Sequence, residues 1–383
     1  MRQIEEVRKE INEIDRQIVD LFLRRMKCSE EVSEFKMHTG GQVLVTAREN
    51  ELLNTMLENV PDSLKQEYTS LLRTTTRISR KYQYTRILKA EPFRLQLPIT
   101  ARIDTPHTVC YQGLQASYQD AAAKALFPDA ERYPLKTFED VFLEVSEGRA
   151  DAGVVPIENS TAGTINEVYD LLEKHGLYIS HSYIGRIRHC LAACKDATLD
   201  TVKTVHSHPQ ALRQCHHYIQ DHNLAEVEES NTAIAAEEIA RLGDPARAAI
   251  CSEEAAKLYG LTVLQHNIND GDFNQTRFIA VTRGLSAKEE DNRVSLILII
   301  PHVTGSLYAA LSVFSDYGLN MTEIHSRPLA NMPWNYCFYI DFAGNILNED
   351  TRTMIYQLTQ EIPVVRILGS FPVIEEEGLN END

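Results

Sequence analysis

An arginine interrupts an otherwise apolar face of the first expected helix, and further basic residues lie around it in the first 90 residues. Apolar residues at alternating three- and four-residue steps mark this face, namely Ile4, Val7, Ile11, Ile14, Ile18 and Leu21. The same steps then reach Arg25. A buried guanidinium without a partner is costly, so this arginine either extends to water or meets an anion. By itself, Arg25 leaves both interpretations open.

Further polar residues around Arg25 favour a site for a small dicarboxylate. Lys36 lies 11 residues after Arg25, about 16 Å along nearly the same helix face. Arg8 lies 17 residues before Arg25, about 25 Å away. One small ligand cannot easily span that distance, so Arg8 would join the site from an antiparallel partner chain. The whole set is Arg8, Arg25, Lys36, Arg48, Glu49, Ser79 and Gln83.

Polar turns in the middle of the chain are candidates for a second site. A strand runs into the turn that begins at Glu158, and such turns bind anions through backbone N–H groups or simply cap the next helix. Two further polar segments cover residues 207–214 and 274–278. Each segment alone is a weak signal.

Neither a metal nor a nucleotide cofactor is expected. The histidines and the cysteine between residues 206 and 222 match no established zinc spacing, and Cys190 and Cys194 lack a matching second pair. No G-x-G-x-x-G or Walker loop follows an expected strand.

The last module has a turn that suits a small ligand. Gly305 lies between an expected strand and helix, where glycine lets backbone amides approach a ligand and the helix start suits a carboxylate. A second polar segment, residues 324–328, ends a strand at Pro328. A helix cap and a strand-ending proline explain the same residues equally well.

Three modules of different type must position these residues, so we predict a multidomain chain. Residues 1–90 are expected to form a long, a short and a long helix, which cannot easily close a core alone, so two copies should interlock. Residues 91–105 contain prolines and are expected to be a linker.

The other two modules combine strands and helices. Residues 106–285 alternate β-like and helical runs, which predicts an α/β domain with a largely parallel sheet in two halves, crossing at 178–193 and returning near Thr262. Residues 293–373 predict the order βαββαβ of an α+β ferredoxin-like fold, with strands at 294–300, 320–328, 334–342 and 364–371. Residues 374–383 are expected to be a solvated acidic tail.

Composition limits the partners. The 383 residues include 38 Lys+Arg and 55 Asp+Glu, a formal net charge of −17, which argues against nucleic-acid binding through bulk charge. Residues 1–90 hold 16 of these cations and 14 of the anions, so an anion site is more expected there. The seven scattered cysteines fit a reduced compartment. With no membrane-length apolar run and no signal-peptide core, we expect a cytoplasmic protein.

The polar set on the three expected helices resembles the all-α chorismate mutases, in which two intertwined chains form two sites. The resemblance implies that Arg8 reaches across from the partner, that Arg25 and Arg48 help to bind two carboxylates, and that Ser79 belongs to the site. It also implies that Lys36 and Gln83 hydrogen-bond the ether oxygen and that Glu49 binds the ring hydroxyl. The pattern departs at Val45, where the family commonly has an aspartate.

These residue types suit the rearrangement of chorismate to prephenate. The reaction is unimolecular and pericyclic, so it needs no nucleophile and no obligatory base. The catalyst must hold the compact conformer and stabilise the charge that grows on the oxygen of the breaking C–O bond. A glutamine donates an N–H at any pH, whereas a glutamate would have to be protonated.

The middle domain resembles prephenate dehydratase through four segments in order: 113–121, 156–160, 207–210 and 276–278. The resemblance implies two α/β lobes of the periplasmic-binding-protein type with the active site in the cleft. Prephenate would lose its ring hydroxyl and a carboxylate, as CO₂, to give phenylpyruvate. Thr276 would be the donor at the hydroxyl. The substrate-binding residues would be Glu158, Asn159, Ser160, Thr161, Ser207, Gln214, Arg277 and Phe278. Either Glu158 or a water would supply the proton.

The last module resembles the ACT domains of prephenate dehydratases, which bind phenylalanine between two chains. Those typically read Gly-Ala-Leu and Glu-Ser-Arg-Pro, where this chain has Gly-Ser-Leu and His-Ser-Arg-Pro. The implied phenylalanine-contacting residues are Gly305, Ser306, Leu307, His325 and Ser326. His325 removes a carboxylate from this pattern.

Together, the resemblances imply a bifunctional enzyme of phenylalanine biosynthesis, homodimeric through its first and last modules and inhibited by L-phenylalanine. No cofactor, metal, nucleic acid or membrane is expected to take part. One alternative is a non-catalytic sensor of amino acids or aromatic acids. The other is a monofunctional dehydratase with a first module that serves only as a scaffold.

Overall fold

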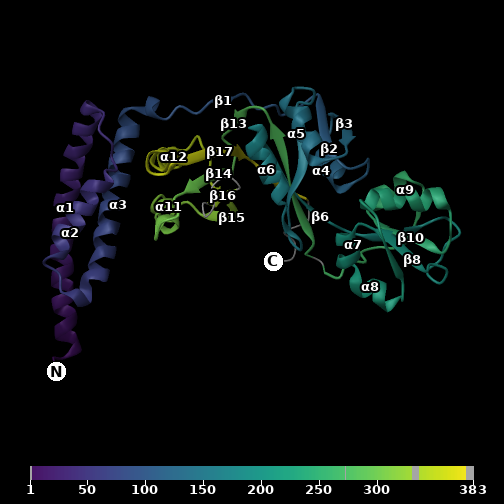
Figure 1. Cartoon of the computed structure of the whole chain (residues 1–383), viewed down its shortest axis with the longest axis horizontal. Helices are drawn as coiled ribbons and strands as arrows, with labels where there is room; N and C mark the ends of the chain where they lie inside the picture. The colour runs from purple at the N-terminus through teal and green to yellow at the C-terminus, as the bar shows by residue number, and fades with distance from the viewer. Residues whose placement is uncertain (1, 272, 330–335, 377–383) are drawn as a thin grey trace. The chain divides into compact units, whose positions relative to one another are not determined.

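The computed structural model describes residues 2–271, 273–329 and 336–376. The chain divides into two compact units (Figure 1). The first combines Met1–Leu97 with Leu296–Arg366, and the second combines Pro98–Ser295 with Ile367–Asp383. None of the described helices is both long and apolar enough to cross a membrane.

Three helices form the first part of unit one: α1 (Ile4–Thr39), α2 (Thr46–Leu57) and α3 (Lys65–Ala90), with a short 3₁₀ turn, η1 (Asp62–Leu64), before α3. Helix α1 ends at Gly40, whose φ of 70° is a left-handed conformation that glycine adopts without strain. The apolar face of α1 is exposed in the single chain, with Ile11 at 50%, Ile18 at 55% and Leu21 at 59% exposure.

The rest of unit one comes from the segment that holds β14 (Arg293–Ile300), α11 (Ser306–Asp316), β15 (Met321–Pro328), β16 (Tyr336–Ala343), α12 (Glu349–Glu361) and β17 (Val364–Phe371). This is the expected order βαββαβ, with strands arranged β15-β16-β14-β17. Residues 293–295 of β14 and 367–371 of β17 are assigned to unit two. The expected strand from residue 334 begins outside the described residues. Helix α3 packs beside α12, and the rings of Tyr84 and Tyr356 meet edge to face at 5.7 Å.

The described residues of unit two form two larger sheets, each with its own helices (Figure 1). The first has the order β6-β12-β4-β2-β3, formed by β2 (Thr108–Gln112), β3 (Glu131–Leu135), β4 (Ala152–Asn159), β6 (Tyr178–Arg186) and β12 (Gln275–Thr282). The second has the order β11-β7-β10-β8-β9, formed by β7 (Cys190–Ala193), β8 (Thr204–Ser207), β9 (Ala225–Glu228), β10 (Arg247–Cys251) and β11 (Thr262–Gln265).

The helices beside the first sheet are α4 (Tyr118–Leu126), α5 (Phe138–Ser146) and α6 (Asn166–His175). Those beside the second sheet are α7 (Pro209–Gln214), α8 (His216–Asp221), α9 (Thr232–Leu242) and α10 (Glu253–Leu258). The two lobes match the two halves that the sequence predicts. The return near Thr262 is wrong, however, because β11 still belongs to the second sheet and the chain returns only at β12.

Strand pairing is less parallel than the sequence predicts. Neighbours β2, β3 and β4 run parallel, as do β8, β9 and β10. Strand β12 instead lies antiparallel between β4 and β6, and β7 is antiparallel to β10 and β11. The chain passes twice between the lobes, from β6 to β7 and from β11 to β12. The antiparallel strands β7 and β12 directly follow these two crossings.

The segments expected as linker and tail carry structure of their own. Residues 91–105 contain η2 (Pro92–Arg94) and β1 (Ile99–Thr100), which pairs with β13 (Leu285–Ser286). Near the chain end, β18 (Val373–Glu375) pairs with β6. The acidic tail therefore cannot begin at residue 374, and residues 377–383 of the expected tail lie outside the described part. One further short strand, β5 (Gly163–Thr164), pairs with β4.

Candidate active sites

Helices α1 and α3 bring four of the predicted polar residues together. The Lys36 ammonium donates to the Gln83 Oε1 at 3.1 Å and to the Val43 carbonyl at 3.0 Å. The Arg25 guanidinium donates to the Thr75 carbonyl at 3.1 Å and to the Ser79 Oγ. An ammonium only donates, so its partner on Gln83 must be the amide oxygen and not the amide N–H groups.

The two cations of this cluster are partly withdrawn from water. Burial lowers the pKa of Arg25 and of Lys36, and nearby Glu49 opposes the shift in both. Partly desolvated cations attract an anion more strongly than fully hydrated ones. Glu49 itself is held by Arg80, whose Nη1 donates to both carboxylate oxygens at 2.6 and 2.8 Å.

The single chain does not bring Arg8 or Arg48 into this cluster. Arg8 is exposed near the start of α1. Arg48 is exposed on α2 and pairs with Glu51 at 2.7 Å. Val45, the position that departs from the mutase pattern, precedes α2 and is 45% exposed.

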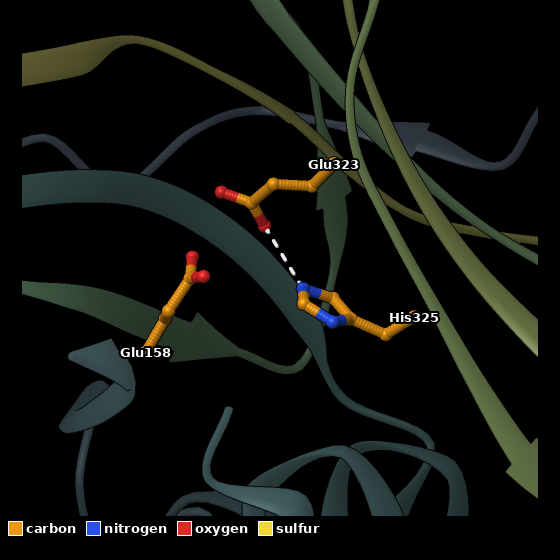
Figure 2. Close-up of side chains that lie close together, drawn as sticks. All are labelled: Glu158, Glu323 and His325. Carbon is orange, nitrogen blue, oxygen red and sulfur yellow. Dashed lines mark ion pairs between the residues drawn. The ribbon is translucent and has the colours of Figure 1, made fainter. Parts of the chain in front are cut away.

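The predicted regulatory residues lie on α11 and β15. Gly305 precedes α11 with a φ of 85°, and Ser306 and Leu307 form the first turn of that helix. His325 lies two residues after Glu323 on β15, and the two side chains approach to 3.6 Å (Figure 2). Glu323 thus places a carboxylate beside the histidine that replaces a carboxylate in the family pattern. Ser326 is exposed.

A cavity of about 410 Å³ in unit two is lined by residues from both lobes. Thr276 and Asn159 line it, on the adjacent strands β12 and β4. The Asn159 Oδ1 accepts from the backbone N–H groups of Thr161, at 3.0 Å, and Ala162, at 2.9 Å. These donors fix the orientation of the amide, whose Nδ2 donates to the Thr276 Oγ1 at 2.8 Å. Because the Thr276 oxygen accepts this bond, its own proton can be donated to a ligand.

Gln214 extends this network to a histidine that sequence reasoning missed. The Gln214 Nε2 donates to the Thr161 Oγ1 at 2.6 Å, and its Oε1 lies 3.0 Å from the His189 Nε2. The His189 Nδ1 is 2.9 Å from the Tyr118 hydroxyl. Both His189 and Tyr118 line the cavity. The position of His189, at the crossing between the lobes, could have identified it.

Among the described residues that line this cavity, none is an Asp, Glu, Lys or Arg. Burial lowers the pKa of His189 to about 4, and burial also lowers that of His208, so both are neutral at pH 7. The first turns of α4 and α9 reach the cavity through Gln119 and Thr232. Helix starts present backbone N–H groups and favour carboxylates.

Several predicted residues lie elsewhere. Glu158 and Arg277 do not line the cavity, because successive strand residues face opposite sides of the sheet and their neighbours Asn159 and Thr276 face it. The Arg277 Nε donates to the Ser182 Oγ at 3.3 Å on the other side. These two residues therefore do not line this cavity, and their predicted roles in substrate binding stay predictions.

Ser207 and Ser160 also lie outside this cavity. The Ser207 Oγ is fully buried and donates to the Ile250 carbonyl at 2.6 Å, which ties β8 to β10. The Ser160 Oγ donates to the Phe273 carbonyl at 2.6 Å. Thr161 lines a second hollow, which shares Gln214 with the cavity, and Phe278 lines the cavity itself. Only part of the predicted set therefore faces one space.

Known protein families match the first and the middle module. Residues 7–84 match the family chorismate mutase type II, and residues 109–285 match prephenate dehydratase. The bifunctional chorismate mutase/prephenate dehydratase of Aquifex aeolicus is 30% identical over 375 residues, which cover 97% of this chain and 98% of the relative. The protein of the same description from Enterobacter agglomerans is 31% identical, over 96% of this chain and 95% of the relative.

A solved structure agrees in fold. The prephenate dehydratase of Arthrobacter aurescens, in complex with L-Phe, is 30% identical with a TM-score of 0.64, over 69% of this chain and 89% of that one. The chain is thus an enzyme with two activities, which rules out both the non-catalytic sensor and the monofunctional dehydratase. By this similarity along nearly its whole length, the chain belongs to the family of bifunctional chorismate mutase/prephenate dehydratases.

Proposed function

We propose that the Lys36–Gln83 cluster converts chorismate to prephenate and that the cavity around Thr276 converts prephenate to phenylpyruvate. The observation that carries the second assignment is the bond from Asn159 to the Thr276 oxygen. This bond directs the threonine proton toward the bound substrate. The last module is proposed to bind L-phenylalanine and to inhibit the enzyme.

In the first reaction, Arg25 binds a substrate carboxylate, while Lys36 and the Gln83 N–H groups donate to the ether oxygen. Negative charge grows on that oxygen as the C–O bond breaks, so preorganised donors there stabilise the transition state more than the ground state. Glu49 accepts from the ring hydroxyl, and Ser79 keeps Arg25 in place through the bond that joins them. Arg48 turns from Glu51 toward the second carboxylate, together with the partner's Arg8.

In the second reaction, the C–CO₂ bond breaks and its electron pair enters the ring. The ring becomes aromatic as the C–O bond to the hydroxyl breaks, and the departing oxygen takes up a proton to leave as water. A threonine hydroxyl is a poor acid at neutral pH. Thr276 therefore hydrogen-bonds the leaving oxygen, which lowers the charge that develops on it, and water in the cavity supplies the net proton.

The substrate dianion is bound here by neutral donors. Gln119 lines the cavity, as do residues at the starts of α4 and α9. Gln119 and the backbone N–H groups of these helix starts are proposed to bind the carboxylates. A site without fixed cations binds the carboxylate that must leave as neutral CO₂ less tightly than a salt bridge would. Weak binding of that group avoids stabilising the ground state.

The enzyme is proposed to be a homodimer. The face of α1 that includes Ile11, Ile18 and Leu21 is apolar and about half exposed in the single chain, which favours a second copy as its cover. Arg8 lies on the same helix and would reach the partner's cluster. The L-Phe complex of the Arthrobacter relative supports phenylalanine as a ligand. The proposed contacts in this chain are Gly305, Ser306, Leu307, His325 and Ser326.

The role of Thr276 is tested by two substitutions. Thr276→Val removes the hydroxyl and should lower the kcat for prephenate by about 100-fold or more. Thr276→Ser keeps a hydroxyl on the same backbone and should retain most of the activity. Chorismate turnover of both variants serves as the control for folding. Equal activity of the valine and serine variants would remove the hydroxyl from the mechanism.

A further inference from the structure

Arg80 joins two carboxylates that belong to different modules of unit one. Its Nη1 donates to Glu49, as described above, and its Nε donates to the Glu361 Oε1 at 2.8 Å. The side chains of Arg80 and Glu361 are only 13% and 12% exposed. Glu49 belongs to the proposed mutase site. Glu361 is the last residue of α12 in the last module, residues 293–373, which is the C-terminal module.

The C-terminal module holds the Glu361 carboxylate in place. The Gln357 Nε2, one turn earlier on α12, donates to the Glu361 Oε1 at 3.2 Å. The Gln357 Oε1 in turn accepts from the Tyr317 hydroxyl at 3.0 Å, just after α11. The positions of α11 and α12 therefore fix the Glu361 carboxylate that binds Arg80. Burial raises the pKa of Glu361, and Arg80 opposes that shift.

The placement of Glu49 matters because of its neighbours. Glu49 is close enough to Arg25 and Lys36 to interact electrostatically with both. If its carboxylate turned to either cation, it would compete with a substrate carboxylate for the same charge. Arg80 binds both Glu49 oxygens and so fixes the orientation of the carboxylate relative to these two cations.

We propose that Arg80 is a positioning residue of the chorismate mutase site and that Glu361 makes this position depend on the C-terminal module. The inference rests on the proposed role of Glu49 in the mutase site. A shift of α11 and α12 against α3 would weaken the Arg80–Glu361 pair and free Arg80 and Glu49 to move. Any ligand that favours the shifted arrangement would then lower the affinity for chorismate, and chorismate would weaken the binding of that ligand by the same factor.

The interface also offers a matched control. Arg77 lies one turn before Arg80 on α3 and pairs with Asp316 at the end of α11, at 2.7 and 3.2 Å. This pair is similarly buried, with both side chains 15% exposed. It joins the same two modules but does not contact Glu49. Asp316→Asn therefore weakens the interface without acting on the mutase site through Arg80.

The test is a double-mutant cycle in the full-length enzyme, with chorismate turnover, prephenate turnover and thermal unfolding as readouts. Glu361→Gln should lower kcat/KM for chorismate by about three- to thirtyfold and leave prephenate turnover unchanged. Asp316→Asn should leave both activities within about twofold, although it too weakens the interface. In a Glu49→Gln background, Glu361→Gln should have no further effect, because the Glu49 carboxylate that Arg80 positions has already been removed.

The outcomes separate this inference from the function on which it rests. If Glu49→Gln alone leaves chorismate turnover unchanged, the proposed role of Glu49 is wrong and the inference fails with it. If Glu49→Gln is impaired and Glu361→Gln is not, only the coupling is wrong. Equal losses of chorismate turnover in Glu361→Gln and Asp316→Asn would also overturn the coupling, because they would indicate general loosening of the interface. The coupling would also be overturned if Glu361→Gln lowered kcat/KM for chorismate as much in the Glu49→Gln background as in the unmodified enzyme.

Discussion

At the scale of single residues, each candidate site contains one neutral hydrogen-bond donor that a neighbouring side chain orients. Gln83 and Thr276 each have an oxygen that accepts from a fixed neighbour, Lys36 in one case and Asn159 in the other. In both, we propose that this bond orients the N–H or O–H groups of the residue toward the substrate. The shared principle is that a donor oriented before the reaction costs no reorganisation when charge develops.

The first residue-scale prediction concerns Gln83. Gln83→Glu should lower chorismate turnover at pH 8 by about 100-fold, because an ionised carboxylate cannot donate to the ether oxygen. Activity should rise as the pH falls toward the ordinary carboxyl pKa of about 4.3. Initial rates of the variant between about pH 5 and pH 8 test this, with prephenate turnover at each pH as the control. A pH profile parallel to that of the unmodified enzyme would contradict it.

The second concerns His189, whose pKa in the folded protein is about 4 because of burial. The unfolded chain protonates this histidine below about pH 6.5. Its contribution to the free energy of unfolding is therefore fully present above that pH and is lost as the pH falls toward 4. His189→Gln should reduce the loss of stability between about pH 7 and pH 4.5 by about 2 kcal/mol.

Urea unfolding at several pH values measures this change. His181, buried in the same unit and also with a pKa of about 4, supplies a matched position, because its contribution should persist in the His189 variant. An unchanged dependence of stability on pH in His189→Gln would show that His189 does not titrate as stated.

Sequence patterns identified the chemistry at this scale more reliably than they identified which side chain faces the cavity. Thr276 and Asn159 face it, whereas their neighbours Arg277 and Glu158 do not. A motif contains both neighbours, and strand alternation gives only one of them to each side of the sheet. The side that faces the cleft is decided by the antiparallel pairing of β12 with β4, which local sequence does not reveal.

At the scale of elements, the apolar face of α1 is the feature that calls for a second copy of the chain. Its apolar face is regular in the sequence, so the helix and its need for a partner were predictable from periodicity. The single chain leaves that face exposed and leaves Arg8 outside the Arg25 cluster. The order βαββαβ was predictable in the same way. The antiparallel strands β7 and β12 were not, because their pairing depends on long crossings between the lobes.

Complementation tests the exchange of Arg8 between chains. Arg8→Ala and Lys36→Ala should each abolish chorismate turnover in a homodimer. If each site takes Arg8 from one chain and Lys36 from the other, a mixed dimer has one intact site and one with both defects. Co-refolding equal amounts should restore about a quarter of the unmodified activity, since about half of the dimers are mixed. No recovery in verified mixed dimers would place both residues of a site on one chain.

At the scale of the whole molecule, the two reactions are proposed to use separate sites that the chain assembles in different ways. One lies on helices of unit one, and the other lies between the lobes of unit two. The sequence indicated this modularity through its motifs and its uneven charge. The contact of Arg80 with Glu361 could not be predicted, because it joins residues 281 positions apart without any local pattern.

One time course tests the separation of the two sites most directly. Chorismate, prephenate and phenylpyruvate are followed together after chorismate is added to the full-length enzyme, to Lys36→Ala and to Thr276→Val. The unmodified enzyme should form phenylpyruvate, Thr276→Val should accumulate prephenate at the unmodified initial rate, and Lys36→Ala should leave chorismate unused but convert added prephenate. Loss of both activities from either single substitution in a folded protein, or continued phenylpyruvate formation by Thr276→Val, would contradict two separate sites.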